Sequence, residues 1–169
     1  MRGLDSEMAC AGQSRVFAWP ARLHHPMNHD DAQSSPGLNT PDQRLRILIA
    51  DDFPEWRIQI RKILNSRPEW EVIFEASHGH EAFQKSVELR PDIVLLDIGM
   101  PVMNGFQAAL RIRQGCPGSH IIFVTHTRDE AVMRAALEMG AEGYVLKANI
   151  ASELLPAIAA ALANDRKAP

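Results

Sequence analysis

Short apolar segments alternate with helix-like segments from Leu45 to the end of the chain. One of them, residues 93–96, has four consecutive apolar residues, which is typical of a strand buried on both faces. Strands are expected at 46–50, 71–76, 93–96, 121–124 and 143–146, and helices at 54–65, 80–89, 105–113, 128–139 and 152–163. In the last helix, Ser152 is expected as the N-cap and Pro156 at the edge of the first turn. The alternation predicts an α/β fold, a doubly wound five-stranded parallel sheet with five helices on its two faces.

The chain's length of 169 residues suits one ordinary domain with a sizeable core. Residues 1–43 differ from the rest, because they contain several prolines and no sustained apolar period. We expect them to form a disordered or weakly ordered N-terminal extension. The folded domain is expected to span residues 44–166, with no further domain after the last helix.

The net charge of -3 and the lack of a basic cluster argue against direct DNA binding. The longest apolar stretch, residues 154–163, is too short to cross a bilayer, and the first residues do not resemble a signal peptide. Cys10 and Cys116 lie far apart without metal-ligand spacing, so both are expected to be reduced thiols. These features predict a cytoplasmic protein that contacts neither membrane nor DNA.

Polar side chains follow or end four of the expected strands. Asp51 and Asp52 follow the first strand, Asp97 the third and Lys147 the fifth, and Thr125 follows the fourth. Ligands of open α/β sheets bind beyond the carboxyl ends of the strands, so these side chains are expected to converge. Three crowded carboxylates need a cation among them, and oxygen ligands favour Mg²⁺. A lysine and a hydroxyl can bind phosphoryl oxygens, which makes Asp97 a candidate nucleophile that forms an aspartyl phosphate.

The segments that carry these residues are 48–53, 95–105, 123–125 and 143–147. In this order and spacing they resemble the receiver domain of two-component response regulators, and the resemblance covers residues 45–164. It implies a flavodoxin-like fold with the strand order 2-1-3-4-5.

The resemblance also implies roles for the acidic residues. Asp97 would accept a phosphoryl group from a sensor histidine kinase or a phosphotransfer protein. Asp52 would ligate Mg²⁺ directly, and Asp51 would place a metal-bound water. Asp97 itself and the backbone carbonyl of Gly99 would be further metal ligands. Taken singly, Asp52 has an alternative interpretation, as the cap of the helix that follows it.

Thr125 and Lys147 would each bind a phosphoryl oxygen, and Tyr144 would turn inward as Thr125 is drawn toward the phosphate. The alternative for Tyr144 is an ordinary half-buried strand residue. The switch would change contacts with a downstream protein target or with a second copy of the chain. Ala148 follows Lys147 where many receivers have proline, which resembles receivers that precede a helix-turn-helix output domain of the NarL/FixJ type. Since no such domain follows, a stand-alone or truncated receiver is expected.

His126 departs from the family pattern, in which a small residue is common directly after the threonine. It is a candidate for tuning the lifetime of the phosphate, as is Gly99, and the alternative is an imidazole that points to solvent. Two other functions stay open. One is a docking or dimerisation receiver that works without phosphate. The other is an aspartyl-phosphate phosphohydrolase, which would need a general-acid Asp where Gly99 stands. No enzymatic activity is expected beyond the chain's own phosphorylation and dephosphorylation.

Overall fold

A computed structural model describes residues 44–165 of the chain, with the side chains of residues 44–163. Strands and helices alternate along these residues as the sequence predicts. Their bounds are β1 (Leu45–Ala50), α1 (Pro54–Leu64), β2 (Trp70–Ala76), α2 (Gly79–Leu89), β3 (Ile93–Leu96), α3 (Gly105–Gly115), β4 (His120–Thr125), α4 (Glu130–Glu138), β5 (Gly143–Leu146), the short 3-10 helix η1 (Lys147–Asn149) and α5 (Ile150–Asp165).

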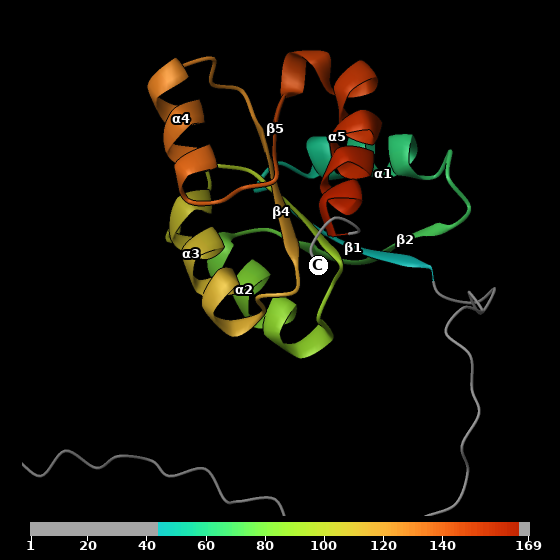
Figure 1. Cartoon of the computed structure of the whole chain (residues 1–169), viewed down its shortest axis with the longest axis horizontal. Helices are drawn as coiled ribbons and strands as arrows, with labels where there is room; N and C mark the ends of the chain where they lie inside the picture. The colour runs from blue at the N-terminus through green and yellow to red at the C-terminus, as the bar shows by residue number, and fades with distance from the viewer. Residues whose placement is uncertain (1–43, 166–169) are drawn as a thin grey trace, which may run out of the picture. The chain divides into compact units, whose positions relative to one another are not determined.

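The five strands form one parallel sheet in the order β2-β1-β3-β4-β5, which confirms the predicted fold class and strand order (Figure 1). Parallel pairing aligns the carboxyl ends of neighbouring strands. Ala50 at the end of β1 pairs with Ala76 of β2 and Leu96 of β3. Toward the β5 edge of the sheet, Thr125 at the end of β4 pairs with Leu146 at the end of β5. The residues that follow these strand ends therefore share one edge of the sheet.

Helices cover both faces of the sheet, with α1 and α5 on one face and α2, α3 and α4 on the other (Figure 1). The α1/α5 side is filled by branched side chains such as Ile60 and Leu154, both fully buried. The other side contains several alanines, among them Ala82, Ala108 and Ala136, which have no exposed surface. Small side chains let these helices approach the sheet closely. Every residue of β3 and β4 is buried, because both strands lie in the middle of the sheet with a helix layer on each side.

The edge strand β2 contains a β-bulge that the sequence pattern did not predict. Ile47 pairs with Val72, whereas its neighbour Leu48 pairs with Phe74, so Ile73 has no opposite residue in β1. Such an extra residue changes which face the following side chains meet. Val72 accordingly packs on the α1/α5 side of the sheet, and Phe74 packs on the opposite side.

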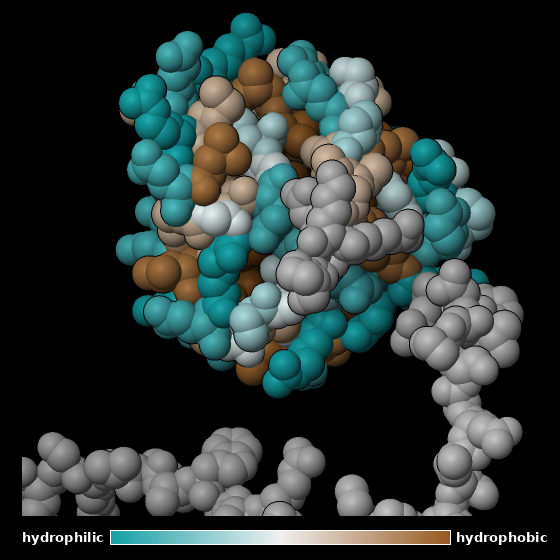
Figure 2. Space-filling model, in the orientation of Figure 1, coloured by the Kyte–Doolittle hydropathy of each residue, from teal (hydrophilic) through white to brown (hydrophobic). Residues whose placement is uncertain are grey.

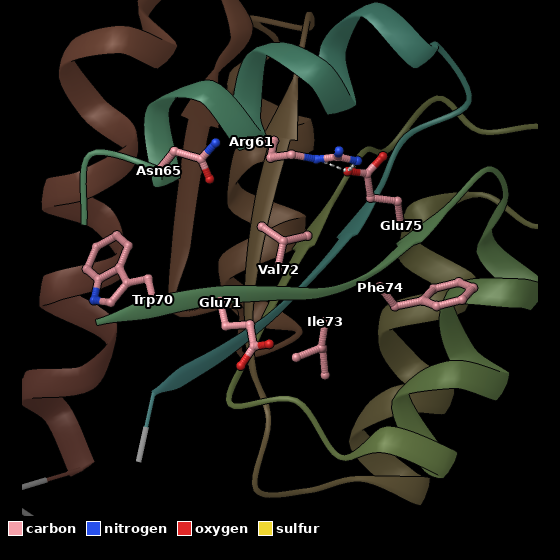
Figure 3. A pocket seen from close by; sticks show the side chains of 8 residues that line it. All are labelled: Arg61, Asn65, Trp70, Glu71, Val72, Ile73, Phe74 and Glu75. Atoms are coloured by element: carbon pink, nitrogen blue, oxygen red, sulfur yellow. Dashed lines mark hydrogen bonds and ion pairs between the residues drawn. The ribbon is translucent and has the colours of Figure 1, made fainter. Parts of the chain in front are cut away.

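Beyond the bulge, Glu75 faces α1 and forms ion pairs with Arg57 (3.5 Å between Nε and Oε2) and Arg61. Figure 3 shows the Arg61–Glu75 pair at one end of a hollow of about 450 Å³ between α1 and β2. The hollow is lined by Arg61, Asn65 and residues 70–75. Because the bulge turns Glu75 toward α1, these ion pairs link the edge strand to the helix that follows Asp51 and Asp52.

The start of α5 differs from the prediction. The helix begins at Ile150, so Ser152 lies inside it and is not the N-cap; its hydroxyl donates to the carbonyl of Asn149 at 3.0 Å. Pro156 lies inside the helix beyond the first turn. The helix starts earlier because η1 leads directly into it and places Ile150 and Leu154 in the core, 2% and 0% exposed. The prediction that Ser152 caps this helix was wrong.

The expected N-terminal extension, residues 1–43, lies outside the described residues, as do residues 166–169. Across the part that the structure describes, no helix is long and apolar enough to cross a membrane. On the face shown in Figure 2, hydrophobic and hydrophilic side chains are interspersed. Large apolar side chains that are exposed come from several elements, such as Phe53 before α1, Leu110 on α3 and Leu137 on α4.

Candidate functional site

Four buried polar side chains meet at the carboxyl edge of the sheet. Asp51 follows β1, Asp97 follows β3, Thr125 ends β4 and Lys147 follows β5. Their exposed fractions are 1%, 5%, 4% and 3%. Buried charges are costly unless they are paired or hold a ligand, so this edge is where the chain departs from an ordinary core.

The ammonium group of Lys147 lies between two of these carboxylates. Its Nζ is 2.6 Å from Oδ2 of Asp51 and 3.0 Å from Oδ1 of Asp97, and all three side chains are nearly excluded from solvent. One cation therefore partly neutralises two anions that come from different strands. The structure brings together the predicted Asp97 and Lys147, which are 50 positions apart in the printed sequence.

The pKa of the Asp51 carboxyl is raised above its usual value by two effects, chiefly burial and, to a smaller extent, the negative charge of Asp97. Lys147 and a hydrogen bond from the backbone amide of Phe53 to Oδ1, 3.0 Å long, act in the opposite direction. The net rise shows that the protein's own donors do not fully compensate this carboxylate. The charge balance of the site favours an additional cation.

Asp52 supplies the third carboxylate. Its Oδ1 is buried and has no hydrogen-bond partner among the residues that the structure describes. It does not cap α1, since Phe53 occupies the N-cap position and no side chain there accepts a capping bond. Oxygen atoms of Asp51, Asp52 and Asp97 all lie within 4.8 Å of one another. An all-oxygen set with an unpartnered buried acceptor fits a hard cation such as Mg²⁺.

The backbone around Asp97 is held tightly. Its amide donates to the carbonyl of Ala50 at 2.8 Å, and its Oδ2 accepts from the amide of Gly99 at 2.8 Å. Gly105 begins α3 directly behind this loop: a Cβ there would lie 2.1 Å from the carbonyl oxygen of Asp97. Only glycine allows the two backbones to approach this closely. The backbone of Asp97 is therefore fixed in place by β1 on one side and α3 on the other.

Thr125 is linked to the loop that follows β4. Its Oγ1 accepts a long hydrogen bond from the amide of Thr127, at 3.4 Å. The hydroxyl of Tyr144 donates to the carbonyl of the same Thr127 at 2.9 Å. Thr125 and Tyr144 are thus connected through one loop residue. His126, which lies between Thr125 and Thr127 in the sequence, is exposed.

The matched family covers most of the described chain. Residues 47–159 match the response regulator receiver domain. The chain belongs to this family. Receiver domains are the signal-accepting part of two-component response regulators, and the aspartate cluster of this receiver is the feature that the sequence alone led us to expect.

Three similar proteins illustrate the relationship. The transcriptional regulatory protein LnrK of Bacillus subtilis is 40% identical over 114 residues, which are 68% of this receiver chain and 52% of the relative. A two-component response regulator of the LuxR family from Aurantimonas is 36% identical, with a TM-score of 0.68 over 72% of this chain and 86% of that one. The CheX-CheY-BeF3-Mg²⁺ complex of Borrelia burgdorferi includes a chain 26% identical, with a TM-score of 0.66 over 70% of this chain and 89% of that one. This chain spans about half the length of the curated relatives, such as LnrK.

Two residues of α1 contact the receiver site and were not singled out from the sequence. The indole ring of Trp56 lies 5.2 Å from Lys147 Nζ and 5.1 Å from the imidazole of His126. Arg57 donates to the carbonyl of Asp51 at 2.6 Å. Trp56 stands one helical turn before the buried Ile60, and this spacing was the available signal that it faces the sheet.

Proposed function

We propose that this receiver accepts a phosphoryl group on Asp97 from a sensor histidine kinase or a phosphotransfer protein. The observation that carries the proposal is the under-compensated acidic cluster: three carboxylates with one lysine, and a buried Asp52 oxygen that has no partner among residues 44–163. Buried carboxylate oxygens in structural ion pairs usually have a hydrogen-bond partner. A site built in this way supports binding of a cation together with a phosphoryl group.

The residues fit Mg²⁺, which would be held by Asp51, Asp52 and Asp97 with the backbone carbonyl of Gly99 as a further ligand. When bound, Mg²⁺ supplies charge neutralisation for the carboxylates and for the phosphoryl oxygens. The Borrelia neighbour, whose structure contains BeF3 and Mg²⁺, supports this assignment by similarity. Asp51 has the least solvent exposure of the three and accepts from Phe53, and its proposed role is to place a metal-bound water.

In the proposed transfer, a carboxylate oxygen of Asp97 forms a bond to phosphorus as the phosphorus–nitrogen bond of the donor histidine breaks. The freed imidazole takes up a proton, and Asp97 carries an acyl phosphate. Lys147 already contacts Oδ1 of Asp97, so its ammonium is placed to bind a phosphoryl oxygen without a large movement. The hydroxyl of Thr125 binds a second oxygen.

Phosphorylation then shifts the population of two loop arrangements. If Thr125 turns toward the phosphoryl group, its long bond to the Thr127 amide breaks, and the carbonyl that holds the Tyr144 hydroxyl moves with it. Tyr144 is therefore the proposed reporter of the switch. The output is a change in contacts with a downstream protein target or a second copy of the chain, in the cytoplasm. His126 and Gly99 border the site and are proposed to tune the phosphate lifetime.

The test is the intact mass of the protein after incubation with acetyl phosphate, with and without Mg²⁺. We expect a Mg²⁺-dependent gain of one phosphoryl group, about 80 Da, in the wild type and none in Asp97→Asn. Asp92→Asn is the matched control, because Asp92 accepts a hydrogen bond from Arg46 at the other end of the sheet. A wild type that gains no mass would contradict the proposal and favour a docking receiver that works without phosphate.

A further inference from the structure

We propose that Trp56 is a positioning residue of the phosphorylation site. Its ring holds the Lys147 ammonium over its face and the His126 imidazole against it, and the two rings together limit the access of water to phosphorylated Asp97. This inference rests on the proposed function, since it concerns the lifetime of the acyl phosphate.

The contact with Lys147 is the first observation. Lys147 Nζ lies 5.2 Å from the centre of the Trp56 ring, and its other two neighbours are the carboxylates of Asp51 and Asp97. An ammonium within about 6 Å of an indole face is attracted by the ring quadrupole, more strongly where water is excluded. The Lys147 side chain is 1% exposed, so water does not compete for this face. The Lys147 ammonium thus contacts two carboxylates and one uncharged side chain, the indole of Trp56.

The contact with His126 is the second observation. The ring centres of Trp56 and His126 are 5.1 Å apart and the ring planes meet at 75°. Edge-to-face pairs of this geometry are a preferred aromatic arrangement. His126 is exposed, yet this contact keeps its imidazole beside the site instead of free in solvent. The pair joins α1 to the loop after β4, and its two members flank the side chains that bind phosphoryl oxygens in the proposed function.

The reaction that the two rings restrain is hydrolysis of the acyl phosphate. A water oxygen forms a bond to phosphorus while the bond from phosphorus to the Asp97 oxygen breaks. Asp97 leaves as a carboxylate; one proton of the water stays on the phosphate and the other goes to solvent. Because water must reach phosphorus for this step, bulky side chains beside Lys147 and Thr125 slow it. Removing the ring of Trp56 opens that approach and releases His126 as well.

The experiment follows the loss of the phosphoryl group by intact mass after the acetyl phosphate is removed, in the presence of Mg²⁺. Trp56→Leu keeps apolar bulk but loses the π face, and we expect its phosphoryl group to be lost about tenfold faster than in the wild type, which corresponds to about 1.4 kcal/mol in the barrier. Trp56→Phe keeps a ring and is expected to rescue most of the lifetime. Trp70→Phe is the matched control, because Trp70 stacks with Arg67 at the start of β2.

A double-mutant cycle tests whether Trp56 and His126 affect the lifetime of the phosphoryl group jointly or independently. His126→Ala alone is expected to shorten the lifetime several-fold, and adding it to Trp56→Leu is expected to have no further effect, because residues in contact are not additive. Tryptophan fluorescence gives an independent readout. In a Trp19→Phe/Trp70→Phe background, which keeps Trp56 as the one tryptophan of the sequence, phosphorylation is expected to change the emission, and Trp56→Phe is expected to abolish that change. A merely structural role would lower thermal stability without altering either readout.

The outcomes separate this inference from the proposed function. If the wild type gains no phosphoryl group, both are overturned. If the wild type is phosphorylated but Trp56→Leu and His126→Ala lose the group at the wild-type rate, only the role of Trp56 is overturned. If circular dichroism shows that Trp56→Leu does not fold, the exposed His126 decides: a wild-type lifetime in His126→Ala overturns the inference, and a shortened one supports it.

Discussion

The two ends of the sheet treat carboxylates in opposite ways. At the amino end, Oδ2 of Asp92 accepts from the amide of Arg46 at 2.7 Å. Glu142 uses both oxygens there, one for Arg113 at 2.9 Å and the other for the amide of Ile121 at 2.8 Å. These carboxylates are bound by donors of the protein itself, as is usual for structural polar groups.

At the carboxyl end, three carboxylates lie around one ammonium group. Asp51 and Asp97 share the single ammonium of Lys147, and Oδ1 of Asp52 has no partner among the described residues. Such an arrangement is costly, and in the proposed function Mg²⁺ and a phosphoryl group supply the missing partners. The two ends therefore differ in burial as well as in pairing, because Asp92 is exposed and Glu142 is half-buried, whereas Asp51 and Asp97 are buried. A carboxylate oxygen that is buried and has no partner within residues 44–163 distinguishes the carboxyl end from the amino end.

Mg²⁺ is expected to give the largest effect, because it supplies what the carboxyl end lacks. At a concentration 100 times its Kd it should raise the free energy of unfolding of the wild type by about 2.7 kcal/mol. Asp52→Asn keeps the size of the side chain but removes its charge, and it should lose most of this gain. The measurement is urea denaturation with and without MgCl₂.

Glu142→Gln is the control for the magnesium experiment, since it alters a carboxylate at the amino end that already has its donors. It should respond to Mg²⁺ like the wild type. An equal stabilisation of Asp52→Asn and the wild type would show that Mg²⁺ binds elsewhere, and the contrast between the two ends would then fail.

A glycine at each end gives the next largest effect. A Cβ at Gly105 would lie 2.1 Å from the backbone oxygen of Asp97, whereas one at Gly143 would lie 3.1 Å from a methyl group of Ile122. Backbone cannot move aside as a side chain can, so Gly105→Ala should lower the free energy of unfolding by about 2 kcal/mol. Gly143→Ala should stay within about 1 kcal/mol of the wild type, because lost freedom of the unfolded chain offsets the tight contact.

Thermal or urea unfolding of the two alanine variants measures this contrast, and phosphorylation by acetyl phosphate adds a functional readout. Gly105→Ala should also be phosphorylated more slowly, since the Asp97 backbone must shift to admit the methyl group. Similar losses in both variants would mean that the amino end is packed as rigidly as the carboxyl end.

The sequence was sufficient for the fold because the signals are local and strong. A run such as residues 93–96 is apolar throughout, which occurs where a strand is covered on both faces, and the alternation with helices leaves a parallel sheet as the solution. The bulge at Ile73 was missed, since the residues around it show no break in apolar pattern. The start of α5 was misplaced because a serine resembled a cap, while burial of Ile150 decided the boundary.

The candidate site was predictable as far as it depends on strand ends. Asp97 and Lys147 directly follow predicted strands, so sheet topology alone brings them near one another. What could not be predicted is how many carboxylates each donor serves, because that depends on side-chain distances. Trp56 was missed for a related reason: its spacing from Ile60 gives a buried face, but only the three-dimensional arrangement shows that the face reaches Lys147.

The last prediction, with the smallest change in stability, concerns Tyr144 of β5, whose hydroxyl donates to Thr127 in the loop after β4. Tyr144 is the only tyrosine of the chain, so its ionisation can be followed alone by ultraviolet absorbance. Burial, and to a lesser extent the negative charge of Asp129, raises the pKa of its phenol above the ordinary value of 10.0. The native protein should therefore titrate at a higher pH than the same protein in urea.

The sign of the stability effect follows from this direction. A group whose pKa is raised on folding holds its proton more tightly in the native state, so its contribution is complete below pH 10.0 and is lost as the pH rises through the folded pKa. Tyr144→Phe should lack this alkaline loss. Asp129→Asn should move the native titration part of the way back, while its amide oxygen can still cap α4 by accepting from Ala131, as Oδ1 does at 2.8 Å. A native midpoint at or below that of the unfolded chain would show that Tyr144 faces water, and that the loop does not connect it to Thr125.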